Sequence, residues 1–452
     1  MHPATQAIRK PSPSTTPHAH SHTHTSARTS SHTSAGPSTR TSTTNKSTIR
    51  ARAGLYLSPT ASFNLLASIT LAFLAGSSAP TPLYALYQSL WGLSPVMITV
   101  VFGVYALAVL TGLLFVGRLS DHVGRRPVLI AATLAQAVTM LLFATAASAA
   151  GLVLARIIQG LITGAALSAV GAAMIDLNKS RGTAANAVAP AFGSAAGGIV
   201  AGFFVQFLPA PTHLIYAALA AVFVAQAVGL KFMKEPIAPI PGAWSSLRPQ
   251  LALPSAARGP LLLAVPVLIA VWALGGLYAS LGPMLVRGML DSNAPLLGGL
   301  ALFVLAASGG IAVLLMQGLE ARKMMALGAA SLLAGTGLAV LALTRSEVAL
   351  FFLATAIAGV GFGTGFQGAV RTVVSVAAPH ERAGTLSIVF IVSYIALGAP
   401  AIIAGAMVRH AGLLATARVF GLLVMALAAA ALIAGVLTSS YRAQAPAAAR
   451  RC

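Results

Sequence analysis

The chain has 452 residues, of which 57% are hydrophobic and 8% are charged, and its formal net charge is +21. Such an apolar composition excludes an ordinary soluble globular domain. The positive charge does not indicate a nucleic-acid partner, because the cations are spread between apolar stretches and leave no soluble domain on which a compact basic face would form. The single cysteine, Cys452, excludes a disulfide within the chain.

Residues 1–57 differ in composition from everything that follows. Of the first 50 residues 22 are Ser or Thr, and none is acidic. So few apolar side chains cannot offset the entropy lost on ordering, so we predict a disordered cytoplasmic tail. Within it four histidines alternate in the run HAHSHTHT. We interpret the run as a solvated polar tract, with loose binding of a metal ion as the alternative, and we predict no defined metal site.

After this tail come twelve apolar stretches, each close to the roughly 20 residues that a membrane-spanning helix needs. They cover residues 61–86, 96–116, 128–146, 152–175, 184–207, 213–230, 261–285, 296–316, 325–343, 348–370, 386–408 and 413–437. The chain is therefore predicted to be an all-α integral membrane protein with twelve spans and the lipid bilayer as its surroundings.

The distribution of cations predicts the orientation of these spans. If both tails and every even-numbered connection face the cytoplasm, that side holds 23 of the 28 Lys and Arg residues. This asymmetry follows the positive-inside rule and would be lost if one helix were added or removed. We expect a multi-pass protein of the cell inner (plasma) membrane with both termini in the cytoplasm.

A polar, proline-rich segment, residues 232–260, divides the spans into two sets of six. An offset of 201 residues brings markers of the two sets into register, among them Pro82 with Pro283, Gly160 with Gly361 and Gly197 with Gly398. Parallel repeats of this kind are an architecture of transporters, with the substrate at the repeat interface. The predicted domains are a bundle at 58–231, a cytoplasmic linker at 232–260, a second bundle at 261–440 and a tail at 441–452, the two bundles being related by a pseudo-twofold axis.

The connection after the second span carries the sequence G-R-L-S-D-H-V-G-R-R-P, residues 117–127. It is predicted to be a tight cytoplasmic turn, since glycine allows close approach of the backbone and proline favours the start of a helix. Its distinctive positions are Gly117, Asp121, Gly124, Arg125 and Arg126. A turn that serves only to orient the spans is the alternative to a gating role.

This loop resembles the signature of the major facilitator superfamily, G-x-L-x-D-x-x-G-R-R/K, and lies between the second and third spans as in that family. The resemblance implies two six-helix bundles that rock about a central cavity. It also implies that Asp121 contacts the positive N-terminal end of the eleventh helix, here near Gly384, and latches one conformation.

The fourth span contains a charge, Arg156, in the sequence R-I-I-Q-G. A charge at bilayer depth costs at least roughly 2.5–3.5 kcal/mol, so Arg156 is predicted to face a polar cavity or partner. The alternative is a position near the outer interface. The spacing resembles a motif of proton-coupled antiporters, which implies a role for Arg156 in proton coupling. Gly160 and Gly164 are predicted to let two helices approach closely.

The fifth span carries Gly193, Gly197 and Gly198. They resemble the antiporter motif G-P-x-x-G-G, with Ser194 in place of the proline, and helix packing by small residues explains them almost as well.

Only seven carboxylates occur in the chain, and all lie in loops or near helix ends. A cationic cargo would therefore lack an acidic partner at mid-membrane depth, which favours a neutral, amphipathic or anionic one. Polar and aromatic side chains that are candidates for lining a cavity are Tyr84, Tyr105, Gln159, Trp272, Tyr278, Gln367 and Tyr394. Packing between helices is the alternative for each of them.

These features together resemble the drug/proton antiporter branch of the major facilitator superfamily. We predict a secondary active transporter that moves a small organic molecule by alternating access, in proton-coupled efflux. A proton-coupled importer or a uniporter of sugars or organic acids is the alternative. No nucleotide-binding P-loop motif is present, no catalytic cluster of His, Asp, Glu or Cys indicates an enzyme, and no cofactor is expected.

Overall fold

The computed structural model describes residues 56–290 and 295–444. Almost all of the predicted tail at 1–57 and its histidine run lie outside the described residues, as does the end of the C-terminal tail. Within the described ranges every regular element is helical. The elements of the first half are α2 (Pro59–Ser78), α3 (Pro80–Trp91), α4 (Pro95–Thr111), a π-helical turn (Gly112–Val116), α5 (Leu119–Val123), α6 (Arg125–Ala144), α7 (Ala149–Leu177), α8 (Lys179–Phe207) and α9 (Pro211–Lys231).

The second half begins with a short helix of the linker. Its elements are α10 (Ala243–Ser246), α11 (Ser255–Leu290), α12 (Pro295–Leu315), α13 (Ala321–Arg345), α14 (Val348–Val374), α15 (Arg382–Ala411) and α16 (Leu413–Gln444). Twelve spans are long and apolar enough to cross a membrane, which confirms the predicted number. The first span is longer than predicted because α2 and α3 follow each other almost without interruption. We call the membrane side at which α2 begins the tail side and the other the far side.

Several spans start at a polar cap followed by proline. Ser58 and Ser94 each accept a hydrogen bond from the backbone N–H three residues later, at 3.2 Å in both cases, and each precedes a proline. A serine cap satisfies an N–H that the helix leaves free, and proline at the first helical position loses nothing by lacking its own. The starts of the first two spans are thus determined locally.

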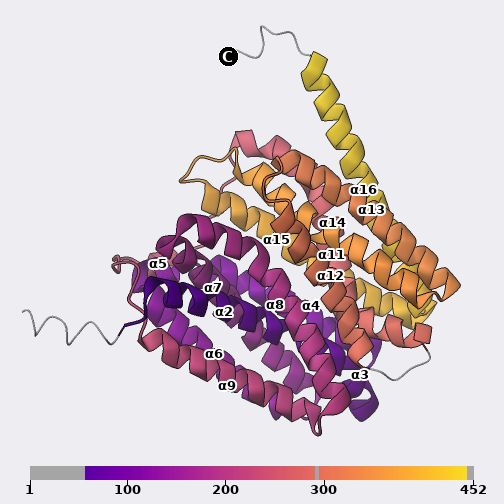
Figure 1. Ribbon diagram of the computed structural model, residues 1–452, viewed down its shortest axis with the longest axis horizontal. Coiled ribbons are helices and arrows are strands. Elements are labelled where there is room, and N and C mark those ends of the chain that lie inside the picture. Colours follow the sequence, from indigo (N-terminus) through magenta and orange to yellow (C-terminus); the bar gives the residue numbers. More distant parts are fainter. Residues whose placement is uncertain (1–55, 291–294, 445–452) are drawn as a thin grey trace, which may run out of the picture. The chain divides into compact units, whose positions relative to one another are not determined.

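The helices form two bundles with matching internal contacts (Figure 1). In the first bundle α2 packs on α8, α4 on α7 and α6 on α9. In the second, the corresponding pairs are α11 with α15, α12 with α14 and α13 with α16. Each bundle has its own core of buried apolar side chains. The repetition of the same three pairings is the structural form of the predicted twofold repeat.

Two helix pairs make most of the contact between the bundles, α4 with α15 and α8 with α12. The pseudo-twofold exchanges these pairs, because it relates α4 to α12 and α15 to α8. On the far side the bundles touch closely. The Oε1 of Gln206 accepts a hydrogen bond of 3.3 Å from the N–H of Leu296, and a methyl group on Gly405 would overlap Thr99. The described far-side ends of the bundles are therefore in contact.

Glycine permits the close approach of α4 and α7. A methyl group on Gly164 would overlap the carbonyl oxygen of Val109, and one on Gly160 would lie 2.7 Å from the carbonyl oxygen of Tyr105. Backbone atoms cannot move aside as a flexible side chain can, so the two helices would have to separate.

We expect Gly164→Ala to lower the unfolding midpoint in detergent clearly, since forcing extra volume into packed helices costs typically 1–3 kcal/mol. Gly288→Ala is the matched control, because a methyl group on this helical glycine meets nothing within 4 Å. Equal midpoints for the two variants would contradict the packing role of Gly164.

Candidate functional site

The side chain of Arg156 lies wholly inside the first bundle, with 0% of its surface exposed. The side chain therefore does not reach the protein surface, as one that snorkels to an interface would. One terminal nitrogen donates to the backbone oxygen of Ser77 at 2.9 Å and to Oε1 of Gln159 at 2.7 Å. The other donates to the hydroxyl of Tyr84 at 2.7 Å. Three neutral acceptors thus hold a charged guanidinium between α2, α3 and α7.

The break between α2 and α3 supplies part of this polar environment. Pro80 has no N–H, so the carbonyl of Gly76, four residues earlier, lacks its usual helical donor. Nε2 of Gln159 donates to that carbonyl at 3.0 Å. Pro80 thus leaves the carbonyl oxygen of Gly76 without a helical donor, and the amide group of Gln159 takes the place of that donor. The same Gln159 side chain accepts from Arg156, so the break in the first span and the polar pair in the fourth are complementary.

Aromatic rings surround the guanidinium on its remaining sides. Its central carbon lies 5.0 Å from the ring centre of Tyr105, 5.7 Å from that of Phe143 and 5.8 Å from that of Tyr84. Ring faces attract cations, and more strongly where water is excluded. No carboxylate pairs with Arg156 among the described residues, and its Nε has no hydrogen-bond partner there. The site is a buried positive charge held by dipoles and rings.

The signature loop forms a second polar cluster at the tail side. Arg125 pairs with Asp121, donates to Oδ2 of Asp176 at 3.1 Å and to the hydroxyl of Ser120 at 2.7 Å. The carboxylates remain accessible to water, with 43% and 29% of the Asp121 and Asp176 side chains exposed. Arg125 thus bridges the second connection and the end of the fourth span. The expected turn includes α5, and α6 begins at Arg125, two residues before the proline.

Glu235 completes this cluster and was not singled out from the sequence. Its two carboxylate oxygens accept from the backbone N–H groups of Arg125 and Arg126 at 2.7 and 2.9 Å. It therefore caps the start of α6, where an anion also interacts favourably with the helix dipole. Gly124 makes room for it, because a methyl group there would lie 3.0 Å from Oε2 of Glu235. A single acid in a linker 110 residues away carries no sequence signal of this contact.

We expect Glu235→Gln to lower the unfolding midpoint, because a hydrogen bond to a charged group contributes about 1.5–3 kcal/mol and glutamine offers only one acceptor. Glu347→Gln is the control. Glu347 also precedes a helix, α14, but makes no side-chain cap hydrogen bond and is exposed. A midpoint no lower than that of the control variant would show that the cap contributes nothing.

The linker touches both the signature loop and the start of α15. Nδ1 of His122 lies 3.1 Å from the carbonyl oxygen of Pro241. At the other end of the linker, the residue packed on Gly384 is Ala252, whose carbonyl accepts from the hydroxyl of Thr385 at 3.4 Å. In this structure the ion-pair partner of Asp121 is Arg125, and the backbone beside Gly384 is that of the linker. The latch between Asp121 and the eleventh span therefore stays a prediction.

The sequence model of the family described as "Major Facilitator Superfamily" matches residues 66–399. The chain belongs to the major facilitator superfamily. Membership makes it a membrane transporter of small molecules and not an enzyme. Comparison with curated protein sequences yields no significant match.

Solved structures of the major facilitator fold resemble the chain along most of its length. The nucleoside transporter NupG is 13% identical with a TM-score of 0.64, covering 82% of this chain and 98% of that one. The D-xylose-proton symporter is 14% identical with a TM-score of 0.65, covering 82% and 96%. The human organic anion transporter MFSD10 is 18% identical with a TM-score of 0.56, covering 82% and 99%. At these identities the resemblance shows the fold alone.

Three of the candidate cavity residues, Tyr105, Trp272 and Tyr394, meet where the two bundles join. Tyr105, whose hydroxyl donates to that of Ser77 at 2.6 Å, belongs to one apolar cluster with Tyr394 of α15. The rings of Tyr394 and Trp272 have centres 5.4 Å apart. A chain of contacts therefore leads from Arg156 through Tyr105 to the second bundle.

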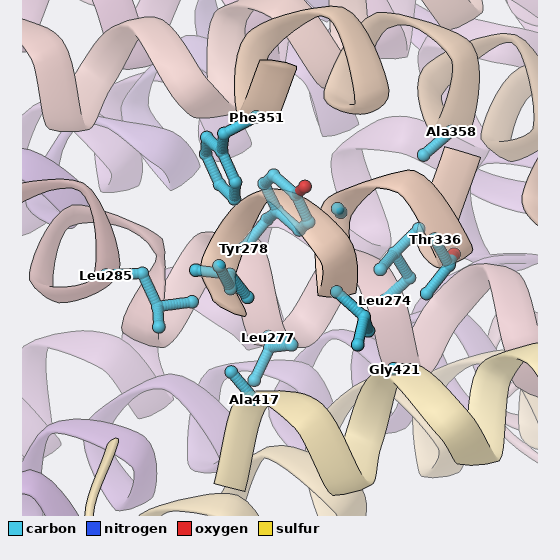
Figure 2. Close-up of a pocket in the computed structure, with 12 residues that line it drawn as sticks. Leu274, Leu277, Tyr278, Leu285, Thr336, Phe351, Ala358, Ala417 and Gly421 are labelled. Carbon is cyan, nitrogen blue, oxygen red and sulfur yellow. The ribbon is translucent and has the colours of Figure 1, made fainter. Parts of the chain in front are cut away.

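The structure places Tyr278 elsewhere. Its hydroxyl lies 2.8 Å from that of Thr355, inside the second bundle, and its ring lines a cavity of about 20 Å³ between α11, α13, α14 and α16 (Figure 2). The 201-residue offset relates Tyr278 to Ser77 and Leu285 to Tyr84. Tyr84, whose hydroxyl accepts from Arg156 in the first bundle, thus corresponds to an apolar residue in the second. Gln367 is partly exposed on α14.

The five glycines predicted to pack helices all lie at helix contacts. Gly160 and Gly164 face α4, Gly193 and Gly197 face α2, and Gly198 faces Gly299 of α12 across the bundle interface.

Proposed function

We propose that the chain exports a small neutral or anionic organic molecule from the cytoplasm in exchange for protons, as in the drug/proton antiporter branch. The membrane is the cell inner membrane and the tail side is cytoplasmic. The motif around Arg156 and the distribution of Lys and Arg support this assignment. The observation that carries it is the charge of Arg156, buried without a carboxylate partner among the described residues.

This charge limits the cargo. A buried cation without an opposing acid repels a cationic molecule and attracts an anionic one. The described carboxylates of the chain all lie in connections or near helix ends: Asp121, Asp176, Glu235, Glu320, Glu347 and Glu381. An anionic group of the cargo would supply the charge that Arg156 lacks, and the aromatic rings around it suit an apolar body.

Arginine keeps its proton at all physiological pH values, so Arg156 would link the cargo to protons through its fixed charge and not by titrating itself. The signature loop would gate this exchange from the tail side, where Asp121 and Asp176 share Arg125. Breaking the pair of Asp121 with Arg125 would free Asp121 to engage the start of α15 in the opposite state of the transport cycle.

A proton-coupled importer or uniporter is the second candidate. It is favoured by the solved structures of the same fold, two of which are described as a nucleoside transporter and a D-xylose-proton symporter. The two candidates differ in direction and share the fold and the site.

Everted membrane vesicles with a preset pH gradient separate the two candidates. Addition of organic anions from a test panel should partly collapse the gradient in vesicles that contain the chain, and not in vesicles with Arg156→Ala. Concentrative uptake of the same compounds by whole cells, with no effect on the vesicle gradient, would overturn export and support import. A response to organic cations alone would contradict the proposed role of Arg156.

A further inference from the structure

We infer that the interior of the first bundle holds a bound-water site between Gln136 of α6 and Gln226 of α9. The inference starts from polar atoms without partners. Gln136 is 0% exposed, and neither its amide nitrogen nor its amide oxygen makes a hydrogen bond within the described chain. Gln226 is 6% exposed; its nitrogen donates to the hydroxyl of Ser68 at 3.3 Å, and its oxygen is without a partner.

The two amides lie at similar depths in the bundle. A methyl group on Gly76 would be 3.8 Å from both the sulfur of Met140 on α6 and a ring carbon of Phe223 on α9. Gln136 lies four residues from Met140 toward the tail side, about 6 Å, and Gln226 lies three residues from Phe223, about 4.5 Å. Counted from the stacked rings of Phe143 and Tyr216, the steps are seven and ten residues, about 10.5 and 15 Å. The two glutamines are therefore level to within about one helical turn.

The direction of both side chains also agrees with a shared site. Gln136 is seven residues from Phe143, nearly two helical turns, so the two residues lie on the same face of α6. Phe143 stacks on Tyr216 of α9 with ring centres 5.0 Å apart. Gln226 reaches Ser68 on α2, which also lines the interior. Both amides therefore face the interior of the first bundle.

Water is the occupant that fits these groups. The nitrogen and oxygen of Gln136 and the oxygen of Gln226 offer one donor group and two acceptors, and a buried water typically makes about three hydrogen bonds. A buried polar group left without a partner costs about 1–3 kcal/mol, so three such atoms in one place would be a large penalty in the absence of water. A metal ion is disfavoured because the described residues contain no group of three or more His, Cys, Asp or Glu side chains that could hold one.

The site also bears on the buried charge. The methyl group placed on Gly76 would also lie 3.8 Å from Nε2 of Gln159. The Oε1 of the same side chain accepts a hydrogen bond from Arg156. Bound water would therefore lie about one helical turn on the tail side of the Gln159–Arg156 pair. A hydrated interior lowers the cost of holding an uncompensated guanidinium there.

Radiolytic hydroxyl-radical labelling of the full-length chain, read by mass spectrometry, tests the site, because bound water produces radicals in place. Met140 and Met174 are both 0% exposed in the first bundle, but only Met140 adjoins Gln136. We expect Met140 to be oxidised several times faster than Met174, and Gln136→Leu to remove the difference. Equal rates in the native chain, or an unchanged Met140 rate in the variant, would overturn the inference.

The sign of a stability change provides a test that does not depend on labelling. Gln136→Met keeps the volume of the side chain and removes its amide. If water satisfies the amide, the variant loses hydrogen bonds and its unfolding midpoint falls. If the amide is unsatisfied, the variant is relieved of a penalty and its midpoint rises, which would contradict the water site.

Discussion

Replacing Arg156 with alanine is expected to reduce transport at least tenfold, which corresponds to about 1.4 kcal/mol of lost interaction with the cargo. The physical reason is that Arg156 is a fully buried charge inside the first bundle, with which the anionic group of the proposed cargo would pair. The measurement is initial uptake of an organic anion by proteoliposomes, at several pH gradients. Transport that remains in the variant should depend less on the pH gradient.

Two further variants separate this role from a general loss of structure. Arg181→Ala also removes a guanidinium from an aromatic ring, that of Phe63 at 4.7 Å, but at an exposed helix start. It should transport nearly normally. Arg156→Lys keeps the charge but lacks the planar fork that joins Ser77, Gln159 and Tyr84, and we expect intermediate activity. If Arg156→Ala is as active as Arg181→Ala at equal folded amounts, the charge has no part in transport.

Asp121→Asn is expected to abolish most transport while leaving membrane insertion and the unfolding midpoint almost unchanged. The stability is spared because the Asp121 side chain is 43% exposed, and exposed ion pairs contribute only about 0–1 kcal/mol. Transport is lost because the neutral amide neither pairs with Arg125 in this state nor engages the positive end of α15 in the other. Proteoliposome uptake and thermal unfolding of the same preparation measure the two effects.

The second bundle offers the matched control. Glu320 and Lys323 form an exposed pair, at 3.6 Å, in the connection that corresponds to the signature loop. Glu320→Gln removes one carboxylate from that pair and should leave transport intact, since the Glu320 side chain makes no cap hydrogen bond to α13 and no ion pair with a further helix among the described contacts. Full activity of Asp121→Asn would remove the proposed gating role of the signature loop.

Much of the fold could be predicted from local properties of the chain. The length of each apolar stretch determines how many spans there are, and the prolines at Pro59 and Pro95 mark where spans begin. Arg156 was identified as exceptional because a cation within an apolar stretch stands out from its neighbours. The same reasoning found Asp121 and Arg125 through a short motif. It did not find Glu235, since a lone acid in a linker looks like any other solvated charge.

The sequence also did not reveal which of the aromatic candidates for lining a cavity lie at the contact between the bundles. Tyr105 and Tyr278 look alike as polar rings in apolar spans, yet one joins the contact between the bundles and the other hydrogen-bonds Thr355 inside the second bundle. Which face of a helix meets which neighbour depends on the packing of all six helices. A periodic pattern does not reveal it when nearly every face of the span is apolar.

By itself the sequence determined the twelve spans, their division into two sets, and the presence of a charge, Arg156, within the fourth span. These follow from hydrophobic length, from the cations between the spans and from the chemistry of proline, all of which act over a few residues. Only the tertiary structure decided that Arg156 is enclosed by the carbonyl of Ser77, by Gln159 and by aromatic rings, and that Glu235 caps α6. The contacts of Arg156 with Ser77 and Tyr84, and that of Glu235 with Arg125, join residues 72 to 110 positions apart. They depend on how the helices pack, and no local pattern of the sequence reveals them.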